Sequence, residues 1–165
     1  MPVLIDGFNL IYKFPELEEL MYLNCLEQAR KGLLDILKDY QRIKKTQIMV
    51  IFDGKKQPSE NLKSEKIGTI DVYYSLDYSA DYLIKEFTKK NHNPRMITVI
   101  TSDKDITLFV KRFKAKVIKS EAFAEHIKKT IEESEKESLK EKEENPEITD
   151  EDISYWEKVF KSKKK

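Results

Sequence analysis

Four aspartates of this chain stand where short apolar runs end. Asp6 follows Val3–Ile5, Asp53 follows Ile48–Phe52, and Asp103 and Asp105 come after Ile97–Ser102. Such β-branched runs without polar alternation are typical of strands buried on both faces, as in a parallel sheet. Because ligands of open parallel sheets bind beyond the carboxyl ends of the strands, we expect these carboxylates to gather there and to repel one another. A hard divalent cation is the usual partner for such a group.

A fifth acid, Asp81, lies at the start of the helix that is expected after the third strand. An acid in a first helical turn can simply complement the helix dipole, or it can reach across the crevice toward Asp6. A central first strand would bring four carboxylates into one acidic pocket: Asp6, Asp81, Asp103 and Asp105. Each acid also has a local explanation. Asp6 and Asp53 precede glycines, as turn residues do, and Asp103 is suited to an N-cap.

The chemistry that suits such a pocket is hydrolysis of phosphodiester bonds assisted by Mg²⁺ or Mn²⁺. The metal lowers the pKa of a bound water and neutralises charge on the phosphoryl oxygens, and a second metal can brace the leaving oxygen. No cysteine, serine or histidine nucleophile is then required. This agrees with a chain whose histidines, His92 and His126, lie in patterns typical of surface residues.

Polar residues beside these acids can support the same chemistry. Asn9 follows Asp6 by three positions, and its amide can orient a ligand phosphate or a metal-bound water. The alternative role for Asn9 is in a turn or an N-cap. Thr101 and Ser102 offer hydroxyl groups next to Asp103, either to a phosphate or as support for a metal ligand.

Alternating strands and helices are expected to position these residues, which predicts an α/β domain with right-handed crossovers. The expected strands are Val3–Ile5, Ile48–Phe52, Ile70–Tyr74, Met96–Thr101 and Ala115–Ile118. The expected helices run from Leu17 or Glu19 to Ile43, from Ser79 to Lys90, from Lys104 to Phe113, and onward from Ser120 as a cap. Residues 54–69 contain Gly54, Pro58 and Gly68 among lysines and polar groups, which indicates a mobile loop.

The composition agrees with one domain followed by a charged tail. The chain has 165 residues, a formal net charge of +1 and one cysteine, Cys25, which excludes an internal disulfide and favours the reducing cytoplasm. No signal peptide or membrane-spanning run is visible. We expect a folded domain over residues 1–130, a charged linker or solvated helix over 131–148, and an amphipathic helix with a basic end over 149–165. That last helix, with Trp156 and Phe160 on one face, docks on its own domain or on a partner.

The chain resembles the NYN domain, and more narrowly its bacterial YacP-like branch, which is related to the PIN-domain nucleases. Four segments carry the resemblance by their order and spacing: Leu4–Asn9, Val50–Gly54, Ala80–Asp81 and Val99–Asp103. It spans about residues 1–130. The resemblance implies a Rossmann-like three-layer α/β/α fold with a central parallel sheet and a metal-dependent ribonuclease centre. It also implies an endoribonuclease that acts on RNA, in some members on translated message at the ribosome.

The resemblance also implies roles for single residues. Carried over by motif, the catalytic set is Asp6, Asn9, Asp81 and Asp103, and Asp53 matches the acid after the second strand. Asp105 completes the expected metal ligands, and Ser102 is expected to support them.

Two positions depart from the family's pattern. Phe8 stands where tyrosine is common, so the ring is kept and the hydroxyl is lost. Tyr82 follows Asp81 where many relatives carry a second acid, and Asp105 or Asp77 can compensate for it.

Phosphate contacts carry most of the affinity for RNA, so lysines near the acidic edge are the expected contacts. They are Lys55, Lys56, Lys63, Lys66 and Lys104, with Lys111 and Arg112 as further candidates. Tyr73, Tyr74, Tyr78 and Tyr82 are available to stack on single-stranded bases.

The main alternative to an enzyme is a non-catalytic RNA-binding module of the same fold, because the second acid after Asp81 is missing. A phosphohydrolase of the haloacid dehalogenase type would need Asp-x-Asp after the first strand, and Asp6-Gly7-Phe8 departs from that motif. A nucleotide-binding loop would need glycines at a spacing that this chain lacks.

Overall fold

The computed structural model describes residues 2–54, 64–75 and 78–144. The strands in these residues are β1 (Val3–Asp6), β2 (Ile48–Phe52), β3 (Ser64–Ile67), β4 (Ile70–Tyr74), β5 (Thr98–Ile100) and β6 (Lys116–Ile118). The helices are α1 (Gly7–Ile11), α2 (Pro15–Tyr22), α3 (Leu26–Lys44), α4 (Ala80–Lys90), α5 (Lys104–Arg112) and α6 (Ser120–Glu144), with a short 3₁₀ helix η1 (Pro94–Met96).

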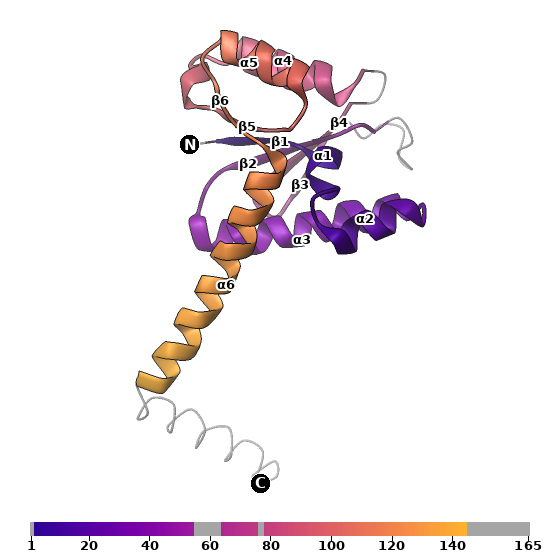
Figure 1. Cartoon of the computed structure of the whole chain (residues 1–165). Coiled ribbons are helices and arrows are strands. Elements are labelled where there is room, and N and C mark those ends of the chain that lie inside the picture. The colour runs from indigo at the N-terminus through magenta and orange to yellow at the C-terminus, as the bar shows by residue number, and fades with distance from the viewer. Residues whose placement is uncertain (1, 55–63, 76–77, 145–165) are drawn as a thin grey trace. The chain divides into compact units, whose positions relative to one another are not determined.

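These strands form a single sheet in the order β3-β4-β2-β1-β5-β6, with helices on both of its faces (Figure 1). All neighbouring strands are parallel except β3, which pairs antiparallel with β4. The predicted α/β fold is confirmed, with an antiparallel edge strand added to the expected parallel sheet.

The first strand is central, because β1 lies between β2 and β5. Asp6, the last residue of β1, pairs in register with Ile51 of β2, and Ile5 pairs with both Val50 and Ile100. The loops that follow β1, β2 and β5 therefore open on the same edge of the sheet, where ligands of such sheets bind. The condition for a shared acidic pocket is met by the topology.

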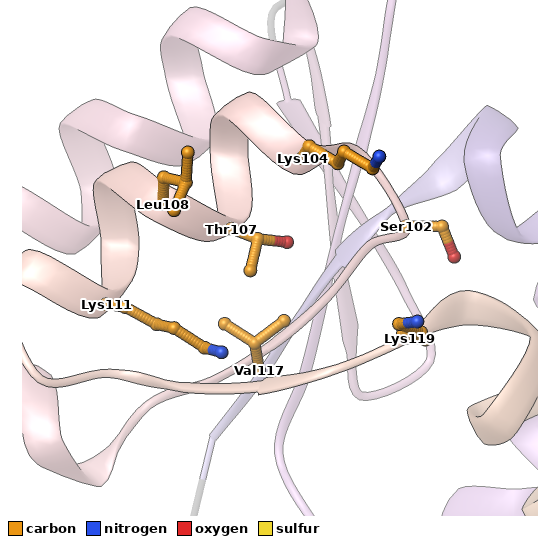
Figure 2. Close-up of a pocket in the computed structure, with 7 residues that line it drawn as sticks. All are labelled: Ser102, Lys104, Thr107, Leu108, Lys111, Val117 and Lys119. Carbon is orange, nitrogen blue, oxygen red and sulfur yellow. The ribbon is translucent and has the colours of Figure 1, made fainter.

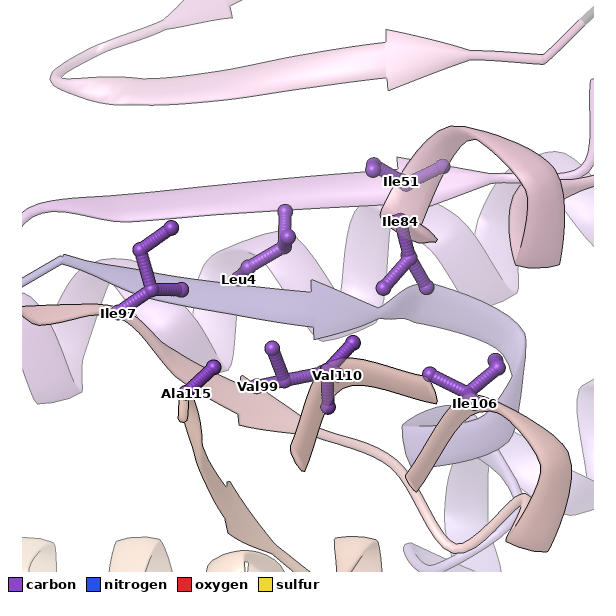
Figure 3. Close-up of a cluster of buried hydrophobic side chains, with 8 residues drawn as sticks. All are labelled: Leu4, Ile51, Ile84, Ile97, Val99, Ile106, Val110 and Ala115. Atoms are coloured by element: carbon purple, nitrogen blue, oxygen red, sulfur yellow. The ribbon is translucent and has the colours of Figure 1, made fainter. Parts of the chain in front are cut away.

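The core on one face of the sheet is made by apolar residues of the strands against α4 and α5. Figure 3 shows this cluster: Leu4, Ile51, Ile84, Ile97, Val99, Ile106, Val110 and Ala115. Burying each large aliphatic side chain stabilises the domain by about 1.5–3 kcal/mol. This packing anchors the starts of α4 and α5, which carry Asp81 and Asp103. Because side chains alternate along a strand, Ile5 and Val50 point to the other face, the side of α1 and α3 (Figure 1).

The single long helix expected to end at Ile43 is wrong, because the segment forms α2 and α3. Asn24 separates them in the left-handed conformation, with a φ of 61°. Leu17 of α2 is buried, and a Cβ atom at Gly32 would lie 2.5 Å from its Cδ2 atom. Gly32 therefore lets the two helices pack closely. Leu23 fits the helical spacing of apolar residues in the sequence, but its side chain is 64% exposed. The apolar spacing therefore continues across the break between α2 and α3 only by coincidence.

The mobile loop expected over residues 54–69 is wrong for its last part, which forms β3. Ile67 pairs with Ile70 across a tight turn, and Gly68 takes a φ of 64° there. A glycine accepts this conformation at no steric cost, which is why such turns favour it. The remainder of that expected loop, residues 55–63, lies outside the described residues.

The last described element, α6, continues to Glu144, so residues 131–144 of the expected charged linker or solvated helix are helical. The chain divides into two compact units, Met1–Lys128 and Lys129–Lys165. The predicted helix over residues 149–165, with Trp156 and Phe160, lies outside the described residues. Among the helices that are described, none is both long and apolar enough to cross a membrane.

Candidate active site

Asp6, the half-buried last residue of β1, is the centre of the candidate site. The Thr101 hydroxyl donates to its Oδ2 atom at 3.1 Å, and the backbone N–H of Asn9 donates to the same carboxylate. Burial raises the pKa of Asp6 from 3.8 to about 6; the charges of Asp103 and Asp81 raise it too, and the two hydrogen bonds lower it. The three carboxylates are therefore near enough to repel one another. We call Asp6, Asp81 and Asp103 the acidic group.

Asp103 is joined to Asp6 through Thr101. The Thr101 side chain is fully buried; its hydroxyl donates to Asp6 and accepts the backbone N–H of Asp103 at 3.1 Å. Asp103 is also the N-cap of α5, since its Oδ1 atom accepts the N–H of Ile106 at 3.0 Å. The N-cap role and a place in the acidic group are thus compatible, and two hydrogen bonds fix the loop after β5 against the end of β1.

Asp81 and Asp105 share a cation, Lys85, which the sequence interpretation missed. The Lys85 Nζ atom lies 3.1 Å from Oδ1 of Asp81 and 2.5 Å from Oδ2 of Asp105. It also lies 5.4 Å from the centroid of the Phe109 ring. The hydrogen bond with Asp105, followed by the interaction with Asp81, raises the pKa of Lys85. Asp105 therefore lies beside Lys85 and is paired with that cation.

The donor atoms of the acidic group suit a hard divalent cation. Carboxylate oxygens are the ligands that Mg²⁺ prefers, and Mg²⁺ needs only one or two of them because it keeps several waters. Oδ1 of Asp81 is buried and forms an ion pair with Lys85 but no hydrogen bond. Within the described residues, no three acidic, histidine or cysteine side chains are close enough to hold a metal ion together. Carboxylate oxygens of one or two of these residues, such as Oδ1 of Asp81, are thus the donors that a largely hydrated ion would use.

Asn9 connects two loops at this edge of the sheet. Its Oδ1 atom accepts the backbone N–H of Ser102 at 2.9 Å and the hydroxyl of Ser120 at 2.6 Å. The Ser102 hydroxyl donates to Glu121 and accepts the backbone N–H of Ser120 at 3.0 Å. The hydrogen bond from Ser102 lowers the pKa of Glu121. Asn9 lies within α1 and positions the loop that carries Asp103, which is neither the turn role nor the N-cap role given as its alternative.

Asp53 is exposed and is held in a local turn at the ends of β2 and β4. Its Oδ1 atom accepts the Ser75 hydroxyl at 3.3 Å, and the Ser75 hydroxyl accepts the backbone N–H of Gly54 at 3.3 Å. This arrangement agrees with its alternative role as a turn residue.

The expected RNA-contacting lysines are divided by the structure. Lys66 lies on β3 and pairs with Asp71 at 3.4 Å. Lys104 lines a pocket of about 330 Å³ between α5 and β6 (Figure 2). Lys55, Lys56 and Lys63 lie outside the described residues, as does Asp77.

Of the four candidate tyrosines, two are available at the surface. Tyr78 and Tyr82 are 57% and 44% exposed, and their rings stack with centroids 4.8 Å apart. They flank Asp81 in the sequence. Tyr74 is buried, and Tyr73 packs edge-on against Phe87, so these two are core residues.

The model of the YacP-like NYN domain family matches residues 3–161 of the chain. The crystal structure of Rae1 (YacP) from Bacillus subtilis is similar, with a TM-score of 0.71 and 23% identity over 96% of this chain and 93% of that one. A crystal structure of a point mutant of the same Bacillus subtilis protein gives a TM-score of 0.69 and 22% identity over 85% and 82% of the two chains. At this identity the likeness concerns the fold. No curated protein matches the chain.

Proposed function

Because the chain belongs to the YacP-like NYN domain family, which is of a nuclease type with an RNA-related function, we propose that it is a metal-dependent endoribonuclease. The observation that supports this most is the gathering of carboxylates at the carboxyl edge of the sheet, where Thr101 joins Asp6 to Asp103. The burial of Asp6 and the charges of its neighbours, which raise its pKa to about 6, agree with this. Strongly shifted carboxyl groups with specific charged neighbours are concentrated at functional sites.

One or two carboxylates of the acidic group, Asp6, Asp81 and Asp103, would hold Mg²⁺ or Mn²⁺, and water would complete its coordination. When bound, such an ion activates a water for attack on phosphorus and neutralises charge on the phosphoryl oxygens. The chain itself supplies positioning. Thr101 fixes two of the carboxylates through hydrogen bonds, and Asn9 fixes the loop between them. A site held in this way reorganises little during the reaction, which is the main source of electrostatic catalysis.

Lys85 supplies a second, permanent positive charge next to Asp81. It lies on the helix turn after Tyr82, the residue that replaces the second acid of many relatives. We infer that the site uses one metal ion. The ammonium group of Lys85 occupies the place beside Asp105 that a second ion would take.

The substrate of this site is single-stranded RNA. The exposed, stacked rings of Tyr78 and Tyr82 offer a surface for bases beside Asp81, because base–aromatic stacking accepts any base. Translated message on the ribosome is the setting that the family resemblance implies.

The test combines metal binding with RNA cleavage. Mn²⁺ and Mg²⁺ are titrated by calorimetry into the wild type, the double variant Asp6→Asn/Asp103→Asn and a control, Asp35→Asn/Asp39→Asn, on the outer face of α3. In parallel, a labelled single-stranded RNA is followed for cleavage. We expect metal binding and cleavage in the wild type and the control, and neither in the double variant. The same assay on message bound to purified ribosomes covers an activity that requires the ribosome.

The second candidate is a non-catalytic RNA-binding module. It is favoured by the ion pairs of Lys85, which neutralise Asp81 and Asp105 without a metal. In that case the wild type binds RNA but leaves it intact with either metal, with and without ribosomes, and calorimetry detects no saturable metal binding.

A further inference from the structure

A pocket of about 330 Å³ lies at the loop that follows β5, where Ser102 is one of its lining residues. Lys104 and Lys111 approach it from α5, and Lys119 approaches it from the segment between β6 and α6 (Figure 2). Leu108 and Val117 supply apolar surface between them. We call this the lysine pocket.

The lysine pocket collects three positive charges, of which that of Lys119 also acts on Glu121. None of its three lysines forms an ion pair with the residues that the structure describes. The nearby hydroxyl groups are engaged elsewhere, since Thr107 donates to the Asp103 carbonyl and Ser102 donates to Glu121. The ammonium groups are therefore the groups available to a ligand, and three cations around one hollow select an anion.

The size and lining of the lysine pocket limit what that anion is. Its volume is at the lower end of the range for small-molecule sites, which begins at about 300 Å³. This is room for one nucleotide unit but not for a duplex. Leu108 is 65% exposed and, with Val117, offers apolar contact for a sugar or a base. Lysines contact phosphate as point charges and read no bases.

The chain places the lysine pocket next to the proposed cleavage site. Ser102 lines the pocket, and the next residue, Asp103, belongs to the acidic group. We propose that the lysine pocket is a subsite that binds a phosphodiester group of single-stranded RNA. It thereby presents a neighbouring phosphodiester of the same strand to the acidic group. Presentation of the strand to the acidic group rests on the proposed ribonuclease function, whereas binding of RNA in the pocket does not.

The test measures RNA binding without cleavage. A short labelled single-stranded RNA is titrated in EDTA with the wild type, with Lys104→Ala/Lys111→Ala/Lys119→Ala, and with Lys31→Ala/Lys44→Ala/Lys89→Ala. The last variant loses the same charge from exposed positions of α3 and α4. We expect the pocket variant to bind at least about tenfold more weakly, with the slope of log affinity against log salt reduced by about 2. Equal weakening in the two variants would mean a general charge effect and would overturn the proposal.

A single substitution tests whether RNA occupies the lysine pocket. Leu108→Glu places a negative charge in the lysine pocket at an exposed helical position, and Leu108→Gln is its neutral control of the same size. We expect the glutamate variant alone to lose RNA binding, with unchanged circular dichroism. Retained RNA binding in Leu108→Glu would overturn the proposal.

The outcomes of these tests distinguish a free nucleotide from an RNA strand as the ligand of the pocket. They also distinguish failure of the subsite from failure of the proposed ribonuclease function. If a free mononucleotide binds the lysine pocket while the pocket variant binds RNA normally, the site serves nucleotides and the strand subsite is wrong. Pocket-dependent RNA binding by a wild type that cuts no RNA upholds the subsite and refutes the ribonuclease. Cleavage that is unaffected by the pocket variant, together with unchanged RNA affinity, refutes the subsite alone.

Discussion

The acidic group and the lysine pocket share one loop, Thr101–Asp103, and they hold charge in opposite ways. Asp6 is half-buried, and hydrogen bonds from Thr101 and Asn9 hold its carboxylate. The lysines of the pocket carry no ion pairs within the described residues. A buried carboxylate that is repelled by neighbouring carboxylates lowers folding stability, and it is kept for its position. An exposed lysine costs little stability, and it attracts anions over a distance that salt screening limits. The first region is therefore suited to chemistry and the second to capture.

The largest expected effect follows from removing one carboxylate of the acidic group. We expect Asp103→Asn to reduce the rate of RNA cleavage at least about a hundredfold, because one fixed electrostatic group is commonly worth that much. The asparagine can still cap α5 through its side-chain oxygen, so the fold is retained. Single-turnover cleavage measures the rate, with Asp35→Asn as the control. Equal rates for the two variants would place the chemistry elsewhere.

The ionised carboxylate of Asp6, in the same acidic group, is expected to lower the stability of the fold. The pH dependence of the free energy of unfolding tests this. Asp6 has a pKa of about 6 in the folded protein and 3.8 as its ordinary value, so the folded state binds its proton more tightly. The stability that this group contributes is fully present below 3.8 and is lost as the pH rises through 6. Asp6→Asn should therefore raise the free energy of unfolding at neutral pH by up to about 3 kcal/mol.

Urea unfolding of the wild type and Asp6→Asn across this pH range measures that difference. The gain should shrink as the pH falls through 6 and should vanish below 3.8, where the carboxyl is protonated in the unfolded state as well. A variant that is less stable than the wild type at neutral pH would contradict the view that Asp6 is kept for function at a cost in stability.

Asn9 connects the two regions, so its loss should affect both. Asn9→Ala leaves the Ser102 N–H and the Ser120 hydroxyl without their acceptor, at a cost of about 1–3 kcal/mol for each buried group that stays unsatisfied. Asn9→Asp retains an acceptor oxygen and should recover most of the loss. We expect kcat to fall more than KM rises, since the loop positions Asp103. An unchanged kcat in Asn9→Ala would mean that the loop holds its place without this residue.

The sheet and the acids at its edge could be predicted from sequence because both depend on local patterns. Buried β-branched runs mark the strands, and the acids follow them directly. The division of the long helix could not be predicted, since Leu23 keeps the apolar period while its side chain is exposed. Nor could the bond between Asn9 and Ser120, which are 111 residues apart, because only the folded sheet brings α1 and α6 together. Lys85 had a local signal, its spacing of four from Asp81, but its pairing with Asp105 depends on the packing of α4 against α5.

Lys85 is the cation that lies next to the acidic group. Replacing it tests whether its ammonium group competes with a metal ion for Asp81. Lys85→Gln removes a positive charge that lies 3.1 Å from Asp81. We expect Mn²⁺ affinity to rise by about tenfold, as Coulomb repulsion over a few ångströms in a partly wet site would give. Lys90→Gln, which breaks a surface pair with Glu86 on the same helix, is the matched control. Calorimetry that finds no difference between these variants would place the metal away from Asp81.

The smallest expected effect concerns the stability of the lysine pocket, and it sharpens the comparison most directly. Exposed substitutions away from packed or paired groups usually change the free energy of unfolding by less than about 0.5 kcal/mol. The variant Lys104→Ala/Lys111→Ala/Lys119→Ala should stay within that limit, with a slight gain at low salt as mutual repulsion of the three ammonium groups is relieved. High salt screens that repulsion, so the gain should vanish there. Urea unfolding at low and high salt measures both values. A loss above about 1 kcal/mol would show that the lysine stems pack on Leu108 and Val117 as structural groups, and the pocket would then resemble the acidic group in being held together by its own contacts.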